Sequence, residues 1–289
     1  MTTVPTGDLV AAARTNGRGI AAFNVITLEY AEAIVAGAER TGLPVILQLS
    51  ENAVRFHGGR VGPVAAAVRA VAADAAVAVG LHLDHVESVT LLRLAPEHGF
   101  SSVMFDASTL PYEDNVTATK AAAEFAHAHS LWLESELGVV GGKDGHRPLP
   151  PHDPGARTDP DQAASYVAAT GVDALAVAVG STHAMANRDA TLDHQLIAAL
   201  RDAVPVPLVL HGSSGAPDVQ LRTAVCHGIT KVNIGTALNV AFTSAVRQIL
   251  GADLSVVDPR KYVRPARDAM TETVAHFLTV LADAQAAVA

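Results

Sequence analysis

An aspartate and a histidine lie side by side in the segment 81–85, Leu-His-Leu-Asp-His, at the end of a run of apolar residues. Two further histidines, His183 and His211, follow two later apolar runs of the same kind. Neutral imidazole is a preferred ligand of Zn²⁺, and three protein ligands leave one coordination position open for a substrate. A carboxylate beside the ion can act as a general acid or base. The pattern therefore predicts an enzyme site in which His85, His183 and His211 bind one divalent metal beside Asp84.

For a single histidine at the end of a strand, a structural role is the commoner explanation. We favour the metal site because three such histidines occur, each after a different apolar run. His82 points to the opposite face from Leu83 in an extended strand and is the strongest reserve ligand. The remaining histidines lie mostly in expected helices and loops and are assigned no role.

Eight short apolar segments alternate with alanine-rich amphipathic segments along the chain. The apolar segments are nearly continuous Val, Ile, Leu and Ala, as in strands that are buried on both faces. An open doubly wound sheet usually has fewer strands, so eight units predict an α/β fold of the (β/α)₈ TIM-barrel type. The expected strands are 20–25, 44–49, 77–83, 100–105, 131–136, 172–179, 206–210 and 230–234, and the expected helices are 29–41, 62–75, 89–98, 112–129, 161–170, 193–203, 217–227 and 237–250.

The segments outside these units predict two further helices and a loop. Residues 1–17 are expected to form an N-terminal helix beneath the barrel, and residues 259–289 a helical C-terminal extension. No linker divides the chain, so residues 1–289 are expected to form a single domain. Residues 138–160, which contain Gly-Gly, Pro-Pro and Asp-Pro pairs, follow the fifth strand. Long loops in compact domains are often functional, so we expect a lid over the site, with a static connector as the alternative.

The composition restricts the partners and the location. The net charge of −9 disfavours nucleic acid and anionic membrane surfaces as partners. No apolar run reaches the ~20 residues of a membrane span, and residues 1–5 lack the features of a signal peptide. The single cysteine, Cys226, excludes an intramolecular disulfide and fits a reducing compartment. We therefore expect a cytoplasmic protein that binds neither nucleic acid nor membrane.

Polar residues collect at the C-terminal ends of the expected strands, where barrel enzymes carry their catalytic groups. Two polar turns, 211–217 and 233–236, follow the seventh and eighth strands. Barrels often bind phosphate there through backbone N–H groups and helix N-termini. Either turn alone is a weak signal, but the pair predicts a phosphate site. The polar residues at the strand ends are Asn24, Ser50, Asp84, His85, Asp106, Glu134, Glu136, Ser181, His183, His211, Ser213 and Asn233.

From about Ala22 to Met270 the chain resembles the class II, zinc-dependent ketose-bisphosphate aldolases, the family of fructose- and tagatose-bisphosphate aldolases. The resemblance implies that His85, His183 and His211 bind one catalytic Zn²⁺ per chain. It also implies a homodimer or homotetramer. The resemblance is carried by six blocks in the family's order: Ala22-Phe23-Asn24, residues 81–85, Glu134-Ser135-Glu136-Leu137-Gly138, residues 176–180 with His183, residues 210–215 and residues 231–234.

The same resemblance implies roles for the other site residues. Glu136 resembles a glutamate that is an alternate ligand of the metal, and Asp84 resembles the acid/base at the aldehyde half. Arg264 is similar to an arginine that binds the distal phosphate in some members, with Ser50 assisting. The implied substrate- and phosphate-binding residues are Asn24, Ser50, Ala184, Gly212, Ser213, Ser214, Asn233, Ile234, Gly235, Thr236 and Arg264.

Three positions depart from the family pattern. Members carry a glycine after the sixth-strand histidine, where it helps bind phosphate and an accompanying monovalent cation, but this chain has Ala184. The base at the substrate carbon is a loop glutamate in the family, whereas this chain offers the shorter Asp144. Gly235 stands where many members have Asp or Ala. These changes leave the metal ligands intact and bear on the preferred ketose and on the rate.

The resemblance implies reversible cleavage of fructose 1,6-bisphosphate or tagatose 1,6-bisphosphate to dihydroxyacetone phosphate and an aldehyde such as glyceraldehyde 3-phosphate, with Zn²⁺ stabilising the enediolate. Another phosphoketose, such as a deoxy-ketogluconate phosphate from inositol breakdown, stays open as the substrate. A non-catalytic sugar-phosphate-binding or assembly subunit is a further alternative. A Schiff-base aldolase is disfavoured, because Lys231 is the one lysine on an expected strand and lies near its start.

Overall fold

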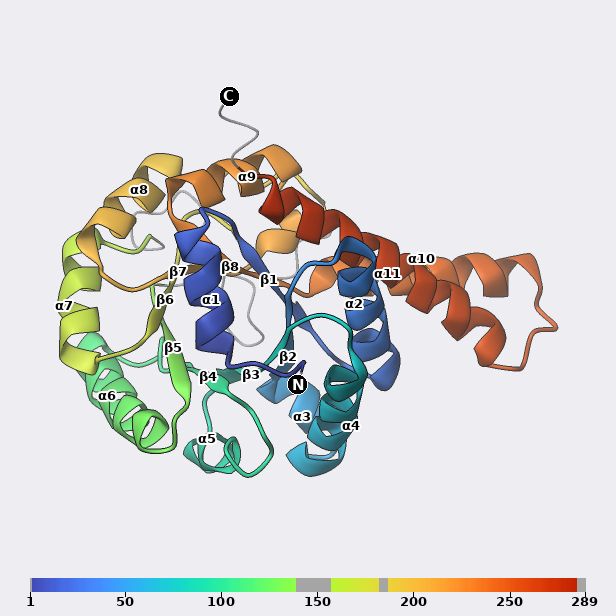
Figure 1. The fold of residues 1–289 in the computed structure, drawn as a ribbon, viewed down its shortest axis with the longest axis horizontal. Helices are drawn as coiled ribbons and strands as arrows, with labels where there is room; N and C mark the ends of the chain where they lie inside the picture. Colours follow the sequence, from blue (N-terminus) through green and yellow to red (C-terminus); the bar gives the residue numbers. More distant parts are fainter. Residues whose placement is uncertain (1, 139–156, 182–186, 285–289) are drawn as a thin grey trace.

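The computed structural model describes residues 2–138, 157–181 and 187–284. In this part of the chain eight parallel strands close into a barrel, each paired with the next and the eighth with the first (Figure 1). Helices lie between the strands and surround the barrel, which confirms the predicted (β/α)₈ fold. The strands are β1 (Ile20–Asn24), β2 (Val45–Ser50), β3 (Val79–Val86), β4 (Ser102–Phe105), β5 (Trp132–Leu137), β6 (Ala174–Val177), β7 (Leu208–Leu210) and β8 (Ile229–Ile234).

The helices follow the sequence pattern except at two places. The helix expected over 89–98 ends at Leu94, because Pro96 has no backbone N–H to continue it. A short helix after β2 was not predicted, because six residues are too few to show helical periodicity. The helices are α1 (Thr6–Thr15), α2 (Leu28–Thr41), α3 (Glu51–Phe56), α4 (Val61–Asp74), α5 (Val89–Leu94), α6 (Tyr112–Ala128), α7 (Pro160–Thr170), α8 (His194–Ala203), η2 (Ser213–Gly215, a 3₁₀ turn), α9 (Asp218–His227), α10 (Thr236–Ala252) and α11 (Arg260–Ala282).

Alternation along each strand sorts the side chains into an outer and an inner set. In β3, Leu81 and Leu83 belong to the large apolar cluster that joins the barrel to the surrounding helices. His82 and Asp84 alternate with them and therefore point into the barrel. All four side chains are buried. The strand thus exposes neither face to solvent, and its two faces differ in chemistry rather than in burial.

The N-terminal end of the barrel interior is apolar and is covered by α1. Leu9 and Val10 of this helix pack against Ile20, Ala22 and Ile46, which point into the barrel from β1 and β2. The predicted helix beneath the barrel is therefore confirmed (Figure 1). Because α1 fills this end with apolar side chains, the polar inner residues of β3, β5 and β8 are left for the opposite end.

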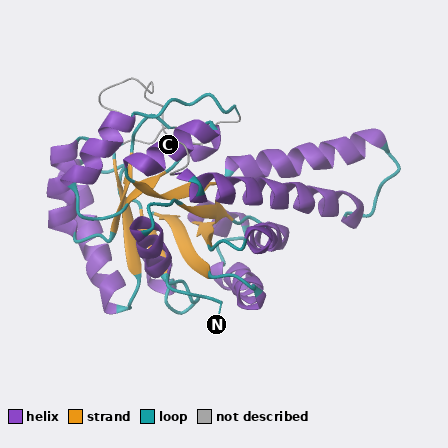
Figure 2. Cartoon of the chain, turned by 45° about the horizontal axis from the view of Figure 1, so that its top comes forward, coloured by secondary structure: helices purple, strands orange, loops and turns teal. Residues whose placement is uncertain are grey.

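The helices α10 and α11 form a hairpin that projects from the side of the barrel (Figure 2). Near the barrel α11 packs along α2, and α10 and α11 pack on each other along their length. The predicted C-terminal helical extension is thus confirmed for residues 260–282. Among the described helices, none combines the length and the hydrophobicity that crossing a membrane requires.

Candidate active site

The inner face of the barrel carries a cluster of polar side chains toward the C-terminal ends of the strands. These side chains come from β3, β5 and β8 and from the residue that follows β7. Each of them is at most 6% exposed. Buried polar and charged groups are destabilising unless they are paired or bind a metal, so a cluster of this size indicates a site. Its members are His82, Asp84, Glu134, Glu136, His211, Lys231 and Asn233.

Two of the predicted metal ligands face each other. Nε2 of His85 lies 3.0 Å from Nδ1 of His211. Nδ1 of His85 lies 2.9 Å from Oδ2 of Asp106, and Nε2 of His211 lies 2.9 Å from Oε1 of Glu134. An ionised carboxylate can only accept a hydrogen bond, so we place the ring protons on these outer nitrogens. The two inner nitrogens then present lone pairs to the same point, as in metal sites where a carboxylate orients each histidine.

The backbone of His85 explains how it reaches this position beside Asp84. Simple alternation would send neighbouring residues to opposite faces of β3. His85 instead has a φ of 48°, in the left-handed region, and the pairing of β3 with β4 shifts register between Leu83 and Val86. Such local strain persists where the surrounding structure holds it and is common at functional sites. The irregularity turns His85 toward His211.

Two groups of described residues could hold a metal ion. One consists of Asp84, His85 and His211, and the other of His85, Asp106 and Glu136, with the ligand atoms of each group within 4.8 Å of one another. Imidazole and carboxylate donors of this kind suit Zn²⁺. The residues present therefore fit the predicted metal. His183, together with Ala184 and Asp144, lies outside the described residues.

Asp84 is held by amide groups from two other strands. Its Oδ2 accepts from Nδ2 of Asn24 at 3.2 Å, and its Oδ1 accepts from Nδ2 of Asn233 at 3.3 Å. Gln48 in turn donates to Oδ1 of Asn24 at 2.9 Å. Asn24 was predicted as a substrate-binding residue, and the structure brings it to the predicted acid/base. Gln48 was missed, although its inward position in β2 follows from alternation.

His82 is buried next to this cluster but belongs to neither metal-binding group of the described residues. Its Nδ1 lies 2.8 Å from Oγ of Ser102. Burial, reinforced by the positive charge of Lys231, holds the pKa of His82 well below its usual value, so the ring is neutral. The structure therefore gives His82 a place in the wall of the site and not among the candidate ligands.

The two predicted phosphate turns lie next to each other. Gly212 takes a left-handed φ of 65° before η2, and Oγ of Ser213 donates to the backbone carbonyl of Asn233 at 2.5 Å. Oγ of Ser214 accepts from the backbone N–H of Ala237, in the first turn of α10, at 3.1 Å. The loops after β7 and β8 are therefore joined directly, and the phosphate site expected from this pair of turns stays a prediction.

Gly235 keeps the turn after β8 close to Asn24. A Cβ atom at position 235 would lie 2.8 Å from Oδ1 of Asn24, closer than real Cβ contacts. Glycine thus permits this approach between β1 and the start of α10. Ile234 belongs to the outer apolar cluster, whereas Thr236 begins α10.

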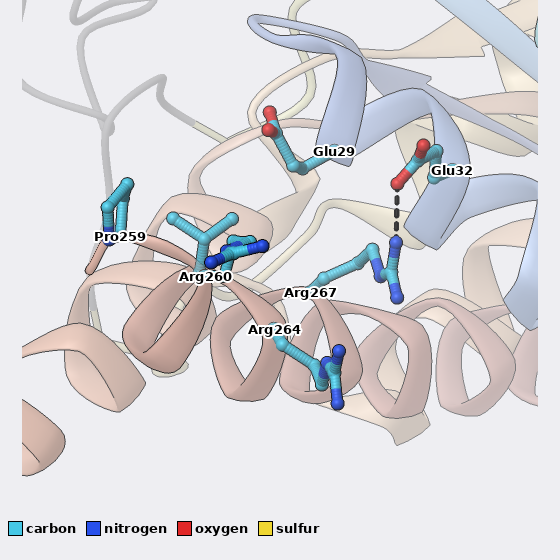
Figure 3. Close-up of a pocket in the computed structure, with 7 residues that line it drawn as sticks. Glu29, Glu32, Pro259, Arg260, Arg264 and Arg267 are labelled. Atoms are coloured by element: carbon cyan, nitrogen blue, oxygen red, sulfur yellow. Dashed lines mark hydrogen bonds and ion pairs between the residues drawn. The ribbon is translucent and has the colours of Figure 1, made fainter.

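The two predicted residues for the distal phosphate lie in different places: Ser50 is the register partner of Asp84 across β2 and β3, whereas Arg264 lies outside the barrel on α11. Ser50 ends β2, where its Oγ accepts from the backbone N–H of Ala53 and caps α3. Arg264 lies on α11 and lines a pocket of about 280 Å³ together with Glu29 and Glu32 of α2 (Figure 3). Among the described residues, no other predicted phosphate-binding residue lines this pocket. The role of Arg264 in phosphate binding stays a prediction.

Two inner residues of the cluster received no role from sequence reasoning. Glu134 was noted as a polar strand-end residue within a resemblance block, and Lys231 was considered only as a Schiff-base lysine and judged too near the start of its strand for that role. The long side chain of Lys231 carries its ammonium to Oε2 of Glu134 at 2.8 Å and to Oδ1 of Asn233 at 2.7 Å. The signal that could have found both is alternation, which places Lys231 on the same face of β8 as Asn233.

The sequence matches a known family over nearly its whole length. The model of the family described as Fructose-bisphosphate aldolase class-II matches residues 4–286. The chain belongs to this family. The fructose-bisphosphate aldolase of Geobacillus stearothermophilus is 40% identical over 87% of each chain. That of Thermus caldophilus is 37% identical over 92% of this chain and 94% of the relative.

Solved structures agree with membership of the class II fructose-bisphosphate aldolase family. The YdjI aldolase from Escherichia coli K12 superposes with a TM-score of 0.82 at 31% identity, over 99% of both chains. A putative fructose-1,6-bisphosphate aldolase from Coccidioides immitis gives a TM-score of 0.83 at 27% identity, over 98% of both chains. The resemblance inferred from the sequence blocks is therefore confirmed, and the family is one of lyases.

Proposed function

We propose that this protein is a metal-dependent aldolase that reversibly cleaves a phosphorylated ketose, fructose 1,6-bisphosphate or tagatose 1,6-bisphosphate. The products are dihydroxyacetone phosphate and an aldehyde such as glyceraldehyde 3-phosphate. One observation carries the proposal: the inner nitrogens of His85 and His211 face each other at 3.0 Å beside the buried carboxylate of Asp84, in a chain of the class II family.

The proposed cofactor is one Zn²⁺ ion per chain. We assign Nε2 of His85 and Nδ1 of His211 as two ligands, because their other nitrogens contact carboxylates. His183 is the third ligand by resemblance, and Glu136, whose Oε2 lies 3.9 Å from Nδ1 of His211, is the alternate. When bound, Zn²⁺ supplies a Lewis acid for the negative charge that develops on the substrate oxygens.

Asp84 is the proposed acid/base at the aldehyde half. In cleavage its carboxylate takes the proton of the C4 hydroxyl while the C3–C4 bond breaks, and the bond's electron pair stays with the dihydroxyacetone phosphate half. Asn24 and Asn233 fix both oxygens of Asp84, so the carboxylate is oriented before the substrate arrives. A preoriented group of this kind is what a proton transfer at a fixed distance requires.

Asp144 is the proposed base at the C3 carbon, by its resemblance to the family's loop glutamate. Exchange of the carbon-bound proton of dihydroxyacetone phosphate with solvent isolates this step from bond cleavage. Asp144→Ala should suppress the exchange strongly and leave metal binding unchanged. If the exchange continued undiminished in this variant, Asp144 would not be the base, and Glu136 or another residue would have to serve.

The joined turns after β7 and β8 are the proposed site for the phosphate of the dihydroxyacetone phosphate moiety. They bring Gly212, Ser213 and Ser214 next to the N-terminus of α10. Backbone N–H groups and the positive end of a helix dipole favour a phosphate at such a place. Ala184 and a monovalent cation remain additional candidates beside this phosphate.

The deciding experiment is the release of dihydroxyacetone phosphate from a panel of phosphoketoses, including a deoxy-ketogluconate phosphate. Chelation should abolish release, and Zn²⁺ or Co²⁺ should restore it. Full activity after chelation, with metal shown absent, would contradict the metal-dependent mechanism. Binding of every sugar phosphate without release would favour a non-catalytic sugar-phosphate-binding or assembly subunit. Borohydride added with substrate should leave the enzyme active, because only an imine is trapped.

We also propose that the protein is a homodimer or homotetramer and acts in the cytoplasm. The projecting hairpin supports self-association, because its tip exposes Leu254 and Val257 at 92% and 89%. Neighbouring exposed apolar side chains that form a patch often mark an interface, and these two lie in the same loop between α10 and α11. Light scattering after size exclusion should give two or four times the chain mass of 29.8 kDa. Leu254→Asp with Val257→Asp should lower that mass, whereas Val219→Asp, at an exposed position of α9, should not.

A further inference from the structure

Lys231 is a buried cation that the proposed reaction does not use. Its side chain is fully buried inside the barrel, and so is that of Glu134. The ammonium donates to Oε2 of Glu134 at 2.8 Å and to Oδ1 of Asn233 at 2.7 Å. Removing two charges from water is expensive, and replacing a buried ion pair by apolar residues is often neutral or stabilising. Fold stability alone therefore gives no reason for this pair.

The first contact of Lys231 leads to a proposed metal ligand. Oε2 of Glu134 accepts from Lys231, and Oε1 of Glu134 contacts Nε2 of His211 at 2.9 Å. A carboxylate that accepts through both oxygens has a fixed plane and a fixed direction. The contact holds the ring proton of His211 on Nε2 and directs its Nδ1 toward His85.

The second contact of Lys231 leads to the proposed acid/base. Lysine can only donate, so the amide oxygen of Asn233 must face it, and the NH₂ group must face away. That NH₂ group donates to Oδ1 of Asp84 at 3.3 Å. Nδ2 of Asn233 also lies 3.1 Å from Nε2 of His211, but with the ring proton on Nε2 both atoms are donors, so this contact is not counted as a hydrogen bond. Lys231 thereby fixes which end of the Asn233 amide points at Asp84.

We propose that Lys231 is a positioning residue that orients the metal ligand His211 through Glu134 and the acid/base Asp84 through Asn233. The inference rests on the function proposed above. One ammonium, placed between the two branches, sets the direction of both groups without touching metal or substrate. The competing explanation is that Lys231 only neutralises the charge of Glu134.

Single and double variants separate these two roles. Lys231→Met keeps the length of the side chain and removes the donor and the charge, and Glu134→Gln removes the partner's charge at constant size. If the lysine only balances charge, the double variant is neutral and should recover both metal affinity and turnover. If the lysine orients His211 and Asp84, the double variant should recover folding stability. Its metal affinity and turnover should stay low, because neither His211 nor Asn233 regains its orienting partner.

The measurement uses the full-length protein with Zn²⁺ or Co²⁺ alone as the probe. Dissociation constants come from competition with a chelator, and the visible spectrum of bound Co²⁺ reports the ligand geometry. We expect each single variant and the double variant to bind metal about 10–100-fold more weakly, the usual effect of losing a partner of a metal-ligating histidine. At saturating metal, kcat should fall with little change in KM.

Tyr166→Phe is the matched control. The Tyr166 hydroxyl is buried on the outer side of β5 and lies 2.9 Å from Oγ of Ser135, without a hydrogen bond to His211 or Asp84. Its loss removes buried hydrogen bonds and should lower stability, but it should leave the metal dissociation constant and the Co²⁺ spectrum unchanged. The control separates positioning from general destabilisation.

The positioning role would be overturned if the folded Lys231→Met variant had the metal affinity, the Co²⁺ spectrum and the kcat of the wild type. Full recovery in the double variant would do the same, in favour of charge balance. If Lys231→Met does not fold, Glu134→Gln and the double variant carry the comparison. If the wild-type protein binds no metal, the proposed function is overturned as well. If the wild-type protein binds metal and the variants bind it with the same affinity, only the positioning role of Lys231 is overturned.

Discussion

The two faces of the barrel strands are equally buried but are held by different forces. In β3, the outward Leu81 and Leu83 and the inward His82 and Asp84 are all at most 4% exposed. The outer pair is stabilised by burial of apolar area, which is nondirectional. The inner pair depends on hydrogen bonds, whose loss leaves a buried polar group unsatisfied. On the outer face, substitutions that keep side-chain volume should therefore preserve stability and activity. On the inner face, substitutions that keep shape but alter hydrogen-bond donors or acceptors should lower stability or activity.

The same division recurs in β5. Leu133 and Leu137 pack outward against the helices, while Glu134 and Glu136 point to the site. Ser135 interrupts the outer apolar face, where its hydroxyl contacts that of Tyr166 at 2.9 Å. In β5 the candidate site residues are thus confined to one face, and variants of the two faces should separate activity from stability.

The largest effect is expected from removal of an inner metal ligand. His211→Ala removes a ligand and leaves Glu134 without its partner at Oε1. We expect loss of bound Zn²⁺ and of measurable aldol cleavage, checked by metal analysis and by release of dihydroxyacetone phosphate. Stoichiometric Zn²⁺ with normal turnover in this variant would remove His211 from the site.

An inner change that keeps shape should be the next largest. Asp84→Asn has nearly the same volume but cannot accept a proton, so kcat should fall about 10²–10⁴-fold, as expected for loss of a positioned acid/base. Metal content should stay close to that of the wild type, whereas the melting temperature should fall, because the new NH₂ group faces an amide donor of Asn24 or Asn233. Leu83→Met, at the outward neighbour, is the control and should retain kcat. Near-normal turnover of Asp84→Asn would reduce Asp84 to a support for its neighbours.

An outer change that creates a cavity should affect stability instead. Leu83 is fully buried in the cluster between barrel and helices. Leu83→Ala should lower the free energy of unfolding by about 2–5 kcal/mol, whereas Leu83→Met should cost less than about 1.5 kcal/mol. Denaturant titration gives these values, and kcat per folded molecule should be nearly unchanged. A selective loss of metal affinity in Leu83→Ala would show that the two faces are coupled.

The smallest effect is expected from the polar group on the outer face. Burial raises the pKa of Tyr166 to about 12, from 10. A raised pKa in the folded state contributes stability that is complete below pH 10 and is lost as the pH rises through 12. The free energy of unfolding should therefore fall between pH 10 and 12, by roughly 2–3 kcal/mol for a shift of this size.

Tyr166→Phe should flatten that decline without abolishing it, because burial also raises the pKa of Tyr30 to about 12. Unfolding curves at several alkaline pH values, combined with tyrosinate absorbance, provide the measurement. An equal decline of the free energy of unfolding in the variant and the wild type would mean that folding does not raise the pKa of Tyr166.

Much of the fold could be predicted because its signals are local. All eight strands were expected, since buried parallel strands read as continuous apolar runs. The helix α3 was missed because six residues carry too little periodicity. The sequence argued only against Lys231 as a Schiff-base lysine; its contact with Glu134 was not predicted, because the reach of its side chain across the barrel was not considered.

The sequence by itself determined the types of the site residues and their order along the strands. It also predicted that the neighbours Asp84 and His85 serve one site, but not how both side chains reach it, because alternation sends neighbours to opposite faces of a strand. The left-handed φ of His85 and the register shift of β3 decided this. The closed barrel then brought His85 to within 3.0 Å of His211, and Asp106 and Glu134 selected which nitrogens face each other. These features depend on contacts between distant strands, and a pattern along one strand contains no information about them.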